Sequence, residues 1–124
     1  MGNIEIEIEP IGKPRMTQRD KTGWKQTKAV RKYFAWKTEF VMKCRVAGVK
    51  GLGGELRVVF VIPFPRSYSV KRKKYLDGKP HEVKPDIDNI EKAVMDCLCK
   101  NDSHVHTHHT RKIWGYEGKI IFEK

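Results

Sequence analysis

The sequence predicts an α+β protein in which a mixed β-sheet of about four strands packs with two main helices. Apolar and polar residues alternate over short stretches near both ends and in the middle of the chain, as they do in strands. Two longer stretches repeat their apolar residues every three or four positions, which is the period of an α-helix. A length of 124 residues suffices for one hydrophobic core, so we expect a single domain over residues 1–124.

The first strand is predicted over residues 3–9, where three isoleucines alternate with three glutamates. Positions 13–37 then hold nine lysines or arginines against one acid, with aromatic residues between them. The part up to Thr27 has no periodicity and is predicted as a basic loop or arm, whose cations could neutralise phosphates. Trp24 in this loop is either a buried residue or an exposed ring that stacks on an unpaired base.

A helix of about five turns is predicted from Ala29 to Ala47, because aromatic residues and a cysteine recur there at helical spacing. These aromatic side chains are predicted to belong to the core. Glycines between positions 48 and 54 end the helix, and their spacing does not match a phosphate-binding loop. Residues 55–64 carry apolar side chains on both faces, which predicts a strand in the middle of the sheet.

Residues 66–84 have little apolar content and are predicted to form a long loop, which in a compact domain is usually functional or mobile. Its cations are Arg66, Lys71, Arg72, Lys73, Lys74, Lys79 and Lys84. The loop ends beside two carboxylates, Asp86 and Asp88, so it would draw backbone phosphate toward them. The alternative is a solvated run of charge without a ligand.

The second main helix is predicted from Asp88 to about Cys99, because apolar residues recur there at helical spacing. Pro85 disfavours helical backbone in the residue before it, so the helix begins only after this proline. Asp88 would be the N-cap, and Glu91 three residues later would complete a capping box.

Asp86 and Asp88 at the start of this helix form a candidate metal site. The free N–H groups and the positive end of the helix dipole attract negative charge. A hard divalent cation such as Mg²⁺, for which Mn²⁺ could substitute, takes oxygen ligands and keeps several waters. Lys92, one turn beyond Asp88, would neutralise charge on a phosphoryl group in the transition state. The alternative is an ordinary capped helix with a surface lysine.

The C-terminal part is predicted as two strands, 105–114 and 119–122, joined by a turn. Asp102, just before them, could supply a third carboxylate. Metal-binding residue types also gather here: Cys97, Cys99, His104, His106 and His108. Two cysteines two positions apart on a helix point in different directions, which disfavours zinc. We expect histidines that face solvent or DNA, and reduced core cysteines.

The formal net charge of +11 favours nucleic acid or another anionic surface as the partner. A basic protein that binds no nucleic acid is the alternative. No apolar run approaches the roughly 20 residues that a membrane span requires, and the glutamate-rich start does not resemble a signal peptide. We therefore expect a cytoplasmic protein that does not associate with membranes.

The motif PDIDNIEK at 85–92, followed by Asp96 and by NDSHV at 101–105, resembles the RusA family of Holliday junction resolvases of bacteria and their phages. The stretch GKPRMT at 12–17 and His81 ahead of the motif are similar to phage-borne members. The resemblance covers most of the chain. It implies a RusA-like fold and a homodimeric, Mg²⁺-dependent endodeoxyribonuclease that cuts four-way junction DNA symmetrically in recombination and repair.

Carried over by position, the resemblance assigns metal binding to Asp86, Asp88 and Asp102. Lys92 would be the essential cation, and Asn89 would support the site. We expect DNA contacts from the following residues: Lys13, Arg15, Arg19, Lys21, Lys71, Arg72, Lys73, Lys74, Lys84 and Asn89.

A helix from Asp88 to Cys99 would be about 18 Å long and would leave Asp102 at its far end. One metal cannot bridge that distance. Either the helix stops a turn or more early and the chain doubles back, which we favour, or Asp102 reaches the site from a partner subunit. The alternative functions are a non-catalytic basic nucleic-acid-binding module, whose carboxylates only cap a helix, and a zinc-stabilised interaction protein.

Overall fold

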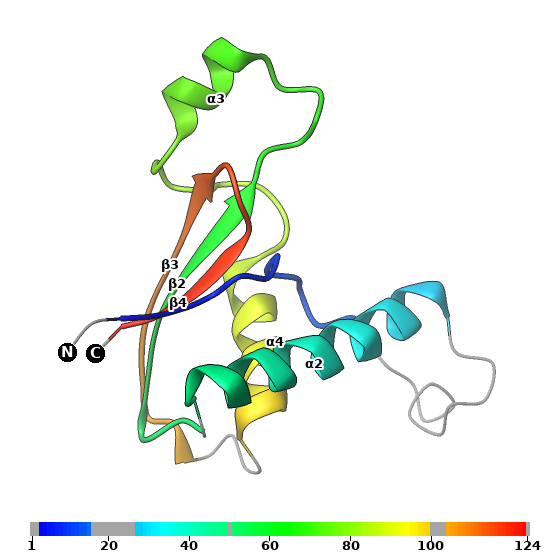
Figure 1. Ribbon diagram of the computed structural model, residues 1–124, viewed down its shortest axis with the longest axis vertical. Coiled ribbons are helices and arrows are strands. Elements are labelled where there is room, and N and C mark those ends of the chain that lie inside the picture. The colour runs from blue at the N-terminus through cyan, green and yellow to red at the C-terminus, as the bar shows by residue number, and fades with distance from the viewer. Residues whose placement is uncertain (1–2, 16–26, 50, 100–103, 124) are drawn as a thin grey trace.

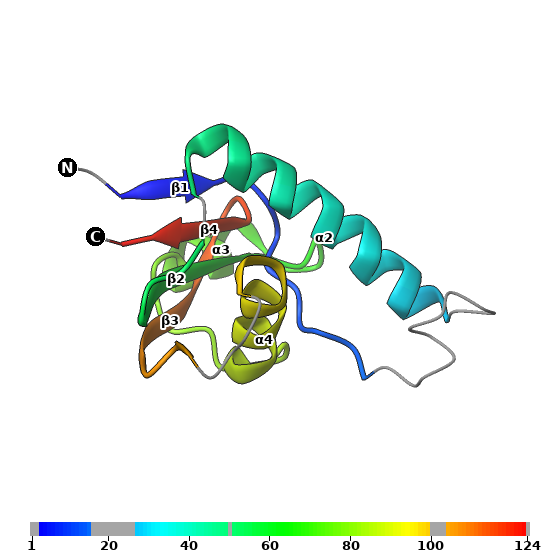
Figure 2. The same cartoon turned by 90° about the horizontal axis from the view of Figure 1, so that it is seen from below.

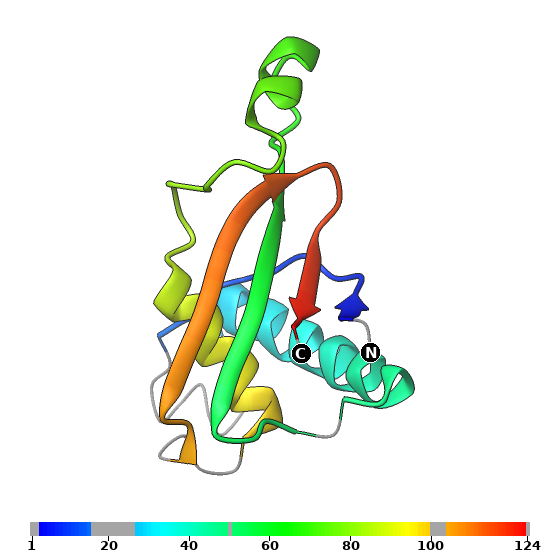
Figure 3. The same ribbon diagram turned by 90° about the vertical axis from the view of Figure 1, so that its left-hand side faces the viewer.

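The computed structural model of the chain describes residues 3–15, 27–49, 51–99 and 104–123. Its elements in chain order are β1 (Ile4–Ile6), α2 (Lys28–Ala47), β2 (Glu55–Pro63), α3 (Val70–Leu76), α4 (Ile87–Leu98), β3 (Thr107–Gly115) and β4 (Lys119–Phe122). The strands form one mixed four-stranded sheet, and both long helices lie on the same face of it (Figure 1, Figure 3). The predicted α+β fold is confirmed.

The strand order in the sheet is β1-β4-β2-β3, so β2 is central as predicted. β2 pairs parallel with β3, where Val58 lies opposite Thr110, and antiparallel with β4, where Val58 lies opposite Phe122. The predicted turn between β3 and β4 therefore does not close a hairpin, because β2 lies between these two strands. A parallel pair needs a crossover connection, and here the crossover contains α3 and α4.

The core lies between the two long helices and the sheet face that they cover (Figure 2). Tyr33, Trp36, Phe40 and Cys44 of α2 are buried there. Ring centroids are 4.9 Å apart for Trp36 and Phe40, and 6.4 Å apart for Phe40 and Phe122 of β4. Burial of one such apolar side chain contributes about 1.5–3 kcal/mol. The prediction that these aromatic residues belong to the core is confirmed.

α2 begins and ends at residues whose chemistry suits those places. Thr27 is the N-cap, and its Oγ1 accepts the backbone N–H of Val30 at 3.2 Å. Gly48 follows the last helical residue with φ of 88°, a left-handed conformation that glycine adopts without a steric penalty. Its N–H donates to the carbonyl of Arg45 at 3.2 Å, so the helix stops at the predicted glycine.

The prediction of a continuous loop over residues 66–84 is wrong, because α3 forms in its middle. The Oγ of Ser69 accepts the backbone N–H of Arg72 at 3.1 Å and caps this helix. No side chain of α3 is buried, and the helix projects beyond the end of the sheet (Figure 1). Since α3 packs no face against the core, it has no apolar periodicity that sequence analysis could detect.

The segment after α3 returns along the outer edge of β3. Backbone N–H groups of Gly78 and His81 donate to the carbonyls of Trp114 and Lys112 at 2.9 and 3.0 Å, and Trp114 donates to Lys79 at 2.9 Å. His81 is only 3% exposed, and its ring centroid lies 4.3 Å from that of Trp114. Burial, followed by the charge of Lys112, lowers the pKa of His81, so this ring is neutral at pH 7.

The predicted N-cap of α4 is wrong by two residues, and the helix begins at Ile87, one residue before the predicted start. Asp86 rather than Asp88 is the N-cap, and the predicted capping box is absent because the Glu91 carboxylate bonds to β3 instead. The expectation that this helix stops early is also wrong. It runs to Leu98, a length of about 18 Å, because its apolar residues keep packing against the core to that point.

Asp96 ties α4 to α2 and to the N-terminal segment. Its carboxylate accepts hydrogen bonds from Tyr33 Oη at 2.6 Å and Lys37 Nζ at 3.1 Å, and Lys13 Nζ lies 3.5 Å away. Burial by itself would raise the pKa of Asp96, but the Tyr33 hydroxyl and the two ammonium groups outweigh burial and lower it. Burial and the neighbouring carboxylate raise the pKa of Tyr33.

We expect Asp96→Asn to reduce the free energy of unfolding by about 1–3 kcal/mol at pH 7, because the variant removes a largely buried charge that has two hydrogen-bond donors and a third cation beside it. A carboxyl group whose pKa is lowered by folding stabilises the protein above its unfolded pKa and loses this effect as pH falls through the folded value. The loss caused by the variant should therefore shrink below about pH 4. Urea unfolding at pH 7 and pH 3 measures the loss in free energy of unfolding, with Glu39→Gln on α2 as the control. An equal loss at both pH values would contradict this account of Asp96.

Candidate active site

Asp86 and Asp88 lie at the N-terminal end of α4, and both residues are exposed. They line an open groove of about 650 Å³ together with residues of the preceding segment, of α4 and of β3: Glu82, Val83, Lys84, Ile87 and Lys112. The free N–H groups of the first helical turn add positive potential at this place. The predicted carboxylate pair is therefore present as two acids of one groove.

Lys92 lies one helical turn after Asp88, with its Nζ 3.9 Å from the Asp88 carboxylate. The two side chains are 58% and 68% exposed, and such a surface ion pair contributes at most about 1 kcal/mol. The ammonium group can therefore exchange this carboxylate for a phosphate oxygen at little cost.

Lys112 of β3 is a residue of the groove that the sequence analysis missed. Its Nζ donates to the carbonyl oxygens of Val83 at 2.6 Å and Pro85 at 2.8 Å. Pro85 directly precedes Asp86 and Val83 lies three residues before it, so Lys112 holds the backbone that leads to the first carboxylate. In the sequence Lys112 is one of 26 basic residues, and only the fold places it beside the motif.

Glu91 joins the same helix to β3. Its carboxylate accepts a 2.5 Å hydrogen bond from Thr110 Oγ1 and pairs with Nδ1 of His108. His108, Thr110 and Lys112 alternate along β3, so they share one face of the strand. All three bond to α4 or to the segment that leads into it. His108 is at the surface, as the sequence analysis expected, but it is engaged with Glu91.

The N-terminal segment passes beside the first turn of α4. The backbone N–H of Lys13 donates to the carbonyl of Asn89 at 3.1 Å. A Cβ at Gly12 would lie 3.3 Å from Cβ of Asn89 and 3.5 Å from Cβ of Pro85, so a larger residue here would press on Asn89 by a few tenths of an ångström. The early glycine-lysine motif is thus packed against the motif that carries the carboxylates.

The described residues that we predicted to bind DNA occupy different surroundings. Lys71–Lys74 belong to the projecting α3, and Lys84 lines the groove. Arg15 is exposed at the end of the N-terminal segment. Lys13 instead faces Asp96, so its ammonium group helps to hold the fold together.

Four residues that the sequence analysis singled out lie outside the described part of the chain: Arg19, Lys21, Trp24 and Asp102. The chain enters β3 near the C-terminal end of α4. The N–H of His106 donates to the carbonyl of Gly54 at 2.9 Å, and a Cβ at Gly51 would lie 3.5 Å from the carbonyl oxygen of Leu98. The nearest described residues on either side of Asp102 are Cys99 and His104. They therefore lie about the length of α4 away from the groove.

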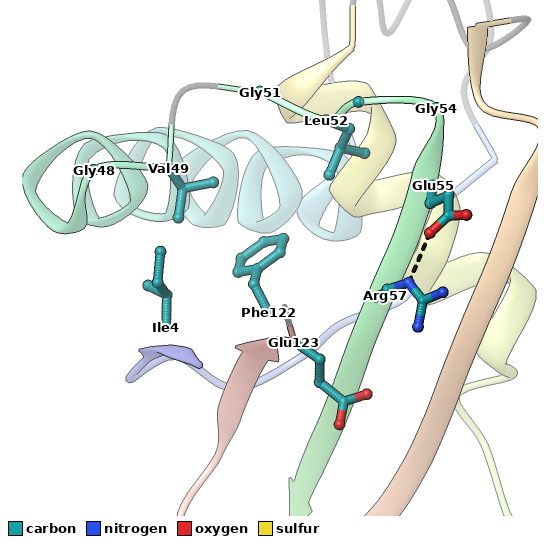
Figure 4. A pocket seen from close by; sticks show the side chains of 11 residues that line it. Ile4, Gly48, Val49, Gly51, Leu52, Gly54, Glu55, Arg57, Phe122 and Glu123 are labelled. Atoms are coloured by element: carbon teal, nitrogen blue, oxygen red, sulfur yellow. Dashed lines mark hydrogen bonds and ion pairs between the residues drawn. The ribbon is translucent and has the colours of Figure 1, made fainter. Parts of the chain in front are cut away.

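A second depression, of about 450 Å³, lies between the end of α2, the start of β2 and the end of β4 (Figure 4). Its apolar lining residues are Ile4, Val49, Leu52 and Phe122. On its rim, Nε of Arg57 donates to the Glu55 carboxylate at 2.7 Å, and this hydrogen bond lowers the pKa of Glu55. The depression holds none of the residues predicted to perform chemistry, so the groove at α4 is the candidate active site.

The donors in the groove fit a hard divalent cation. Mg²⁺ is usually bound through one or two carboxylates, waters and substrate phosphate oxygens, and Asp86 and Asp88 can supply the carboxylates. Within residues 3–15, 27–49, 51–99 and 104–123, no three histidine, cysteine, aspartate or glutamate side chains converge as a ligand cluster. The described part of the site is therefore a partial ligand set.

The fold and this groove define a small basic α+β protein that presents two carboxylates at the start of a helix. The model of the endodeoxyribonuclease RusA family matches residues 7–123, nearly the whole chain, so the protein belongs to the RusA family. It is thus a Holliday junction resolvase that hydrolyses phosphodiester bonds in DNA, and RusA nucleases generally depend on a divalent metal. No curated protein and no solved structure gives a significant match. None of the described helices is long and apolar enough to cross a membrane.

We expect Lys112→Met to raise the metal concentration needed for half-maximal nicking by about ten-fold, because residues that orient metal ligands typically affect affinity on this scale. The methionine keeps most of the alkyl chain but cannot bond the two carbonyls before Asp86. Lys112→Arg, which retains donors, should lose less. Metal titrations of junction nicking measure the effect, with Lys119→Met on β4 as the control. A half-maximal concentration unchanged in Lys112→Met would show that this lysine does not position the site.

Proposed function

We propose that the protein is a Mg²⁺-dependent homodimer that resolves four-way DNA junctions by two symmetric nicks. The observation that carries this proposal is the presence of Asp86 and Asp88 in the groove at the start of α4, with Lys92 one turn further along the helix, in a chain of the RusA family. Two symmetric cuts need two sites related by a two-fold axis, which a homodimer supplies.

In this proposal Asp86, Asp88 and Asp102 hold the cation, and Mn²⁺ can replace Mg²⁺. When bound, the cation polarises the scissile phosphate and lowers the pKa of a bound water. The contribution of the protein is to present the first two carboxylates from a helix end whose leading backbone is held by Lys112. Lys92 stabilises the negative charge that develops on the phosphoryl group. The products carry 5′-phosphate and 3′-hydroxyl ends.

DNA would reach the groove along the basic surface of α3 and the segment that follows it. Lys71–Lys74 provide four consecutive cations on an exposed helix, and Lys84 lies in the groove itself. We assign phosphate contacts also to Arg15, Arg19 and Lys21. Each neutralised phosphate releases condensed counterions, so junction binding should weaken steeply with salt.

The length of α4 favours a third carboxylate from the partner subunit. Asp102 precedes the described residue His104 by two positions, a reach of about 7 Å for extended chain. The helix that separates this region from Asp88 is about 18 Å long. We therefore propose that Asp102 of one protomer completes the site formed by Asp86 and Asp88 of its partner.

We expect Asp88→Asn to bind a four-way junction within about three-fold of wild type and to nick it at least about 100-fold more slowly, because a metal ligand is lost while the cationic surface remains. A labelled junction incubated in Mg²⁺ and in EDTA gives both quantities. Glu39→Gln, which removes an exposed carboxylate of α2, is the matched control and should nick normally. Undiminished cleavage by Asp88→Asn would refute the assignment.

Mixtures of Asp88→Asn and Asp102→Asn protomers test the origin of the third carboxylate. If the site combines residues of two protomers, a mixed dimer contains one site with both aspartates intact. Single-strand nicking should then return to about half of the wild-type rate per mixed dimer, whereas each variant alone stays inactive. Failure of the mixture to nick, with subunit exchange shown by native mass spectrometry, would place all ligands on one chain.

A further inference from the structure

Aromatic rings gather where the α3 segment leaves the sheet. Phe64, directly after β2, has its ring centroid 5.5 Å from that of Trp114, 6.5 Å from Tyr68 and 5.2 Å from Tyr116. Trp114 is buried and anchors the group to β3. Figure 3 shows that β2 and β3 end side by side at the end of the sheet from which α3 projects.

The outer member of this group is open to solvent. Tyr116, in the turn between β3 and β4, is 56% exposed and touches Phe64 edge to face. Phe64 and Tyr68 are half-buried. A single exposed tyrosine is ordinary on a protein surface, but here it extends a packed group of rings to the surface. The result is a stacking surface whose position is fixed by the end of the sheet.

Charge identifies the partner of this surface. The guanidinium carbon of Arg72 lies 3.7 Å from the ring centroid of Tyr68, and α3 continues with lysines on both sides of Arg72. The stretch from Phe64 to Leu76 contains no acid, so it favours phosphate. Glu117, directly after Tyr116, disfavours phosphate at the outer ring itself. Aromatic rings beside cations are the pattern that binds unpaired bases together with their backbone.

We propose that Tyr116, supported by Phe64 and Tyr68, stacks on an unpaired base at the branch point of junction DNA. This inference rests on the proposed function for its substrate, and it adds the basis of selectivity. The bases of a linear duplex are covered by their neighbours, whereas a base at a branch point can expose a face. Lys112 in the groove and Gly115 beside Tyr116 are separated by roughly 10 Å of strand. The stacked base would therefore lie about three base pairs of duplex rise from the groove.

The test uses a four-way junction with 2-aminopurine at the branch point and a linear duplex of the same length, both in EDTA so that no strand is cut. Wild-type protein should quench the 2-aminopurine. Tyr116→Leu should bind the junction about ten-fold more weakly and lose the quenching, with duplex affinity within about two-fold, because one stacked base is lost. Tyr116→Phe keeps the ring and should behave as wild type.

Tyr75→Leu is the matched control. Tyr75 on α3 is 61% exposed, and the Lys79 ammonium lies 3.3 Å from its ring centroid. Tyr75 does not belong to the group of rings around Phe64. Its loss should leave the quenching intact. Unchanged quenching in Tyr116→Leu, or equal losses of junction and duplex binding, would overturn the stacking surface. Wild-type protein that quenches but does not nick in Mg²⁺ would instead contradict the proposed metal-dependent function and leave the stacking surface in place.

Discussion

The polar contact between β3 and the start of α4 is the constraint on which the candidate active site depends. Thr110 and His108 bond to Glu91, and Lys112 bonds to the carbonyls before Asp86. Apolar contacts hold a helix against a sheet without fixing its rotation, because the hydrophobic effect has no direction. Hydrogen bonds fix both distance and angle. The helix end that presents two carboxylates is therefore held in one orientation, as a metal site requires.

The same strand joins the groove to the projecting α3. Its outer edge pairs with the segment around Lys79 and His81, so α3 is connected to the carboxylates by hydrogen-bonded backbone as well as by covalent chain. This backbone pairing would hold α3, the proposed stacking surface at Tyr116 and the groove at constant separation. In a resolvase built this way, the part of β3 from Lys112 to Gly115 would set how far the cut lies from the branch point.

The positive charge of the protein has two physically different uses. Lys13 and Lys37 pair with the Asp96 carboxylate, and Lys112 donates to the Pro85 carbonyl. These three lysines therefore hold parts of the fold together. The cations of α3 and of the groove rim face solvent and are available for phosphate. Composition cannot separate these two groups, because a lysine that is buried against a carboxylate and one that faces DNA look alike in the sequence.

Much of the fold followed from the sequence by itself, because periodicity and end signals are local. The pattern of apolar residues predicted both long helices and all four strands, and the PDIDN motif placed a carboxylate pair at the start of a helix. What only the tertiary structure decided was where the polar side chains bond. Glu91 could cap its own helix or bond to β3, and Lys112 could face solvent or the motif. Those choices depend on distances between segments far apart in the chain, which local periodicity does not encode. Helix α3 escaped prediction for the related reason that no packed face constrains its sequence.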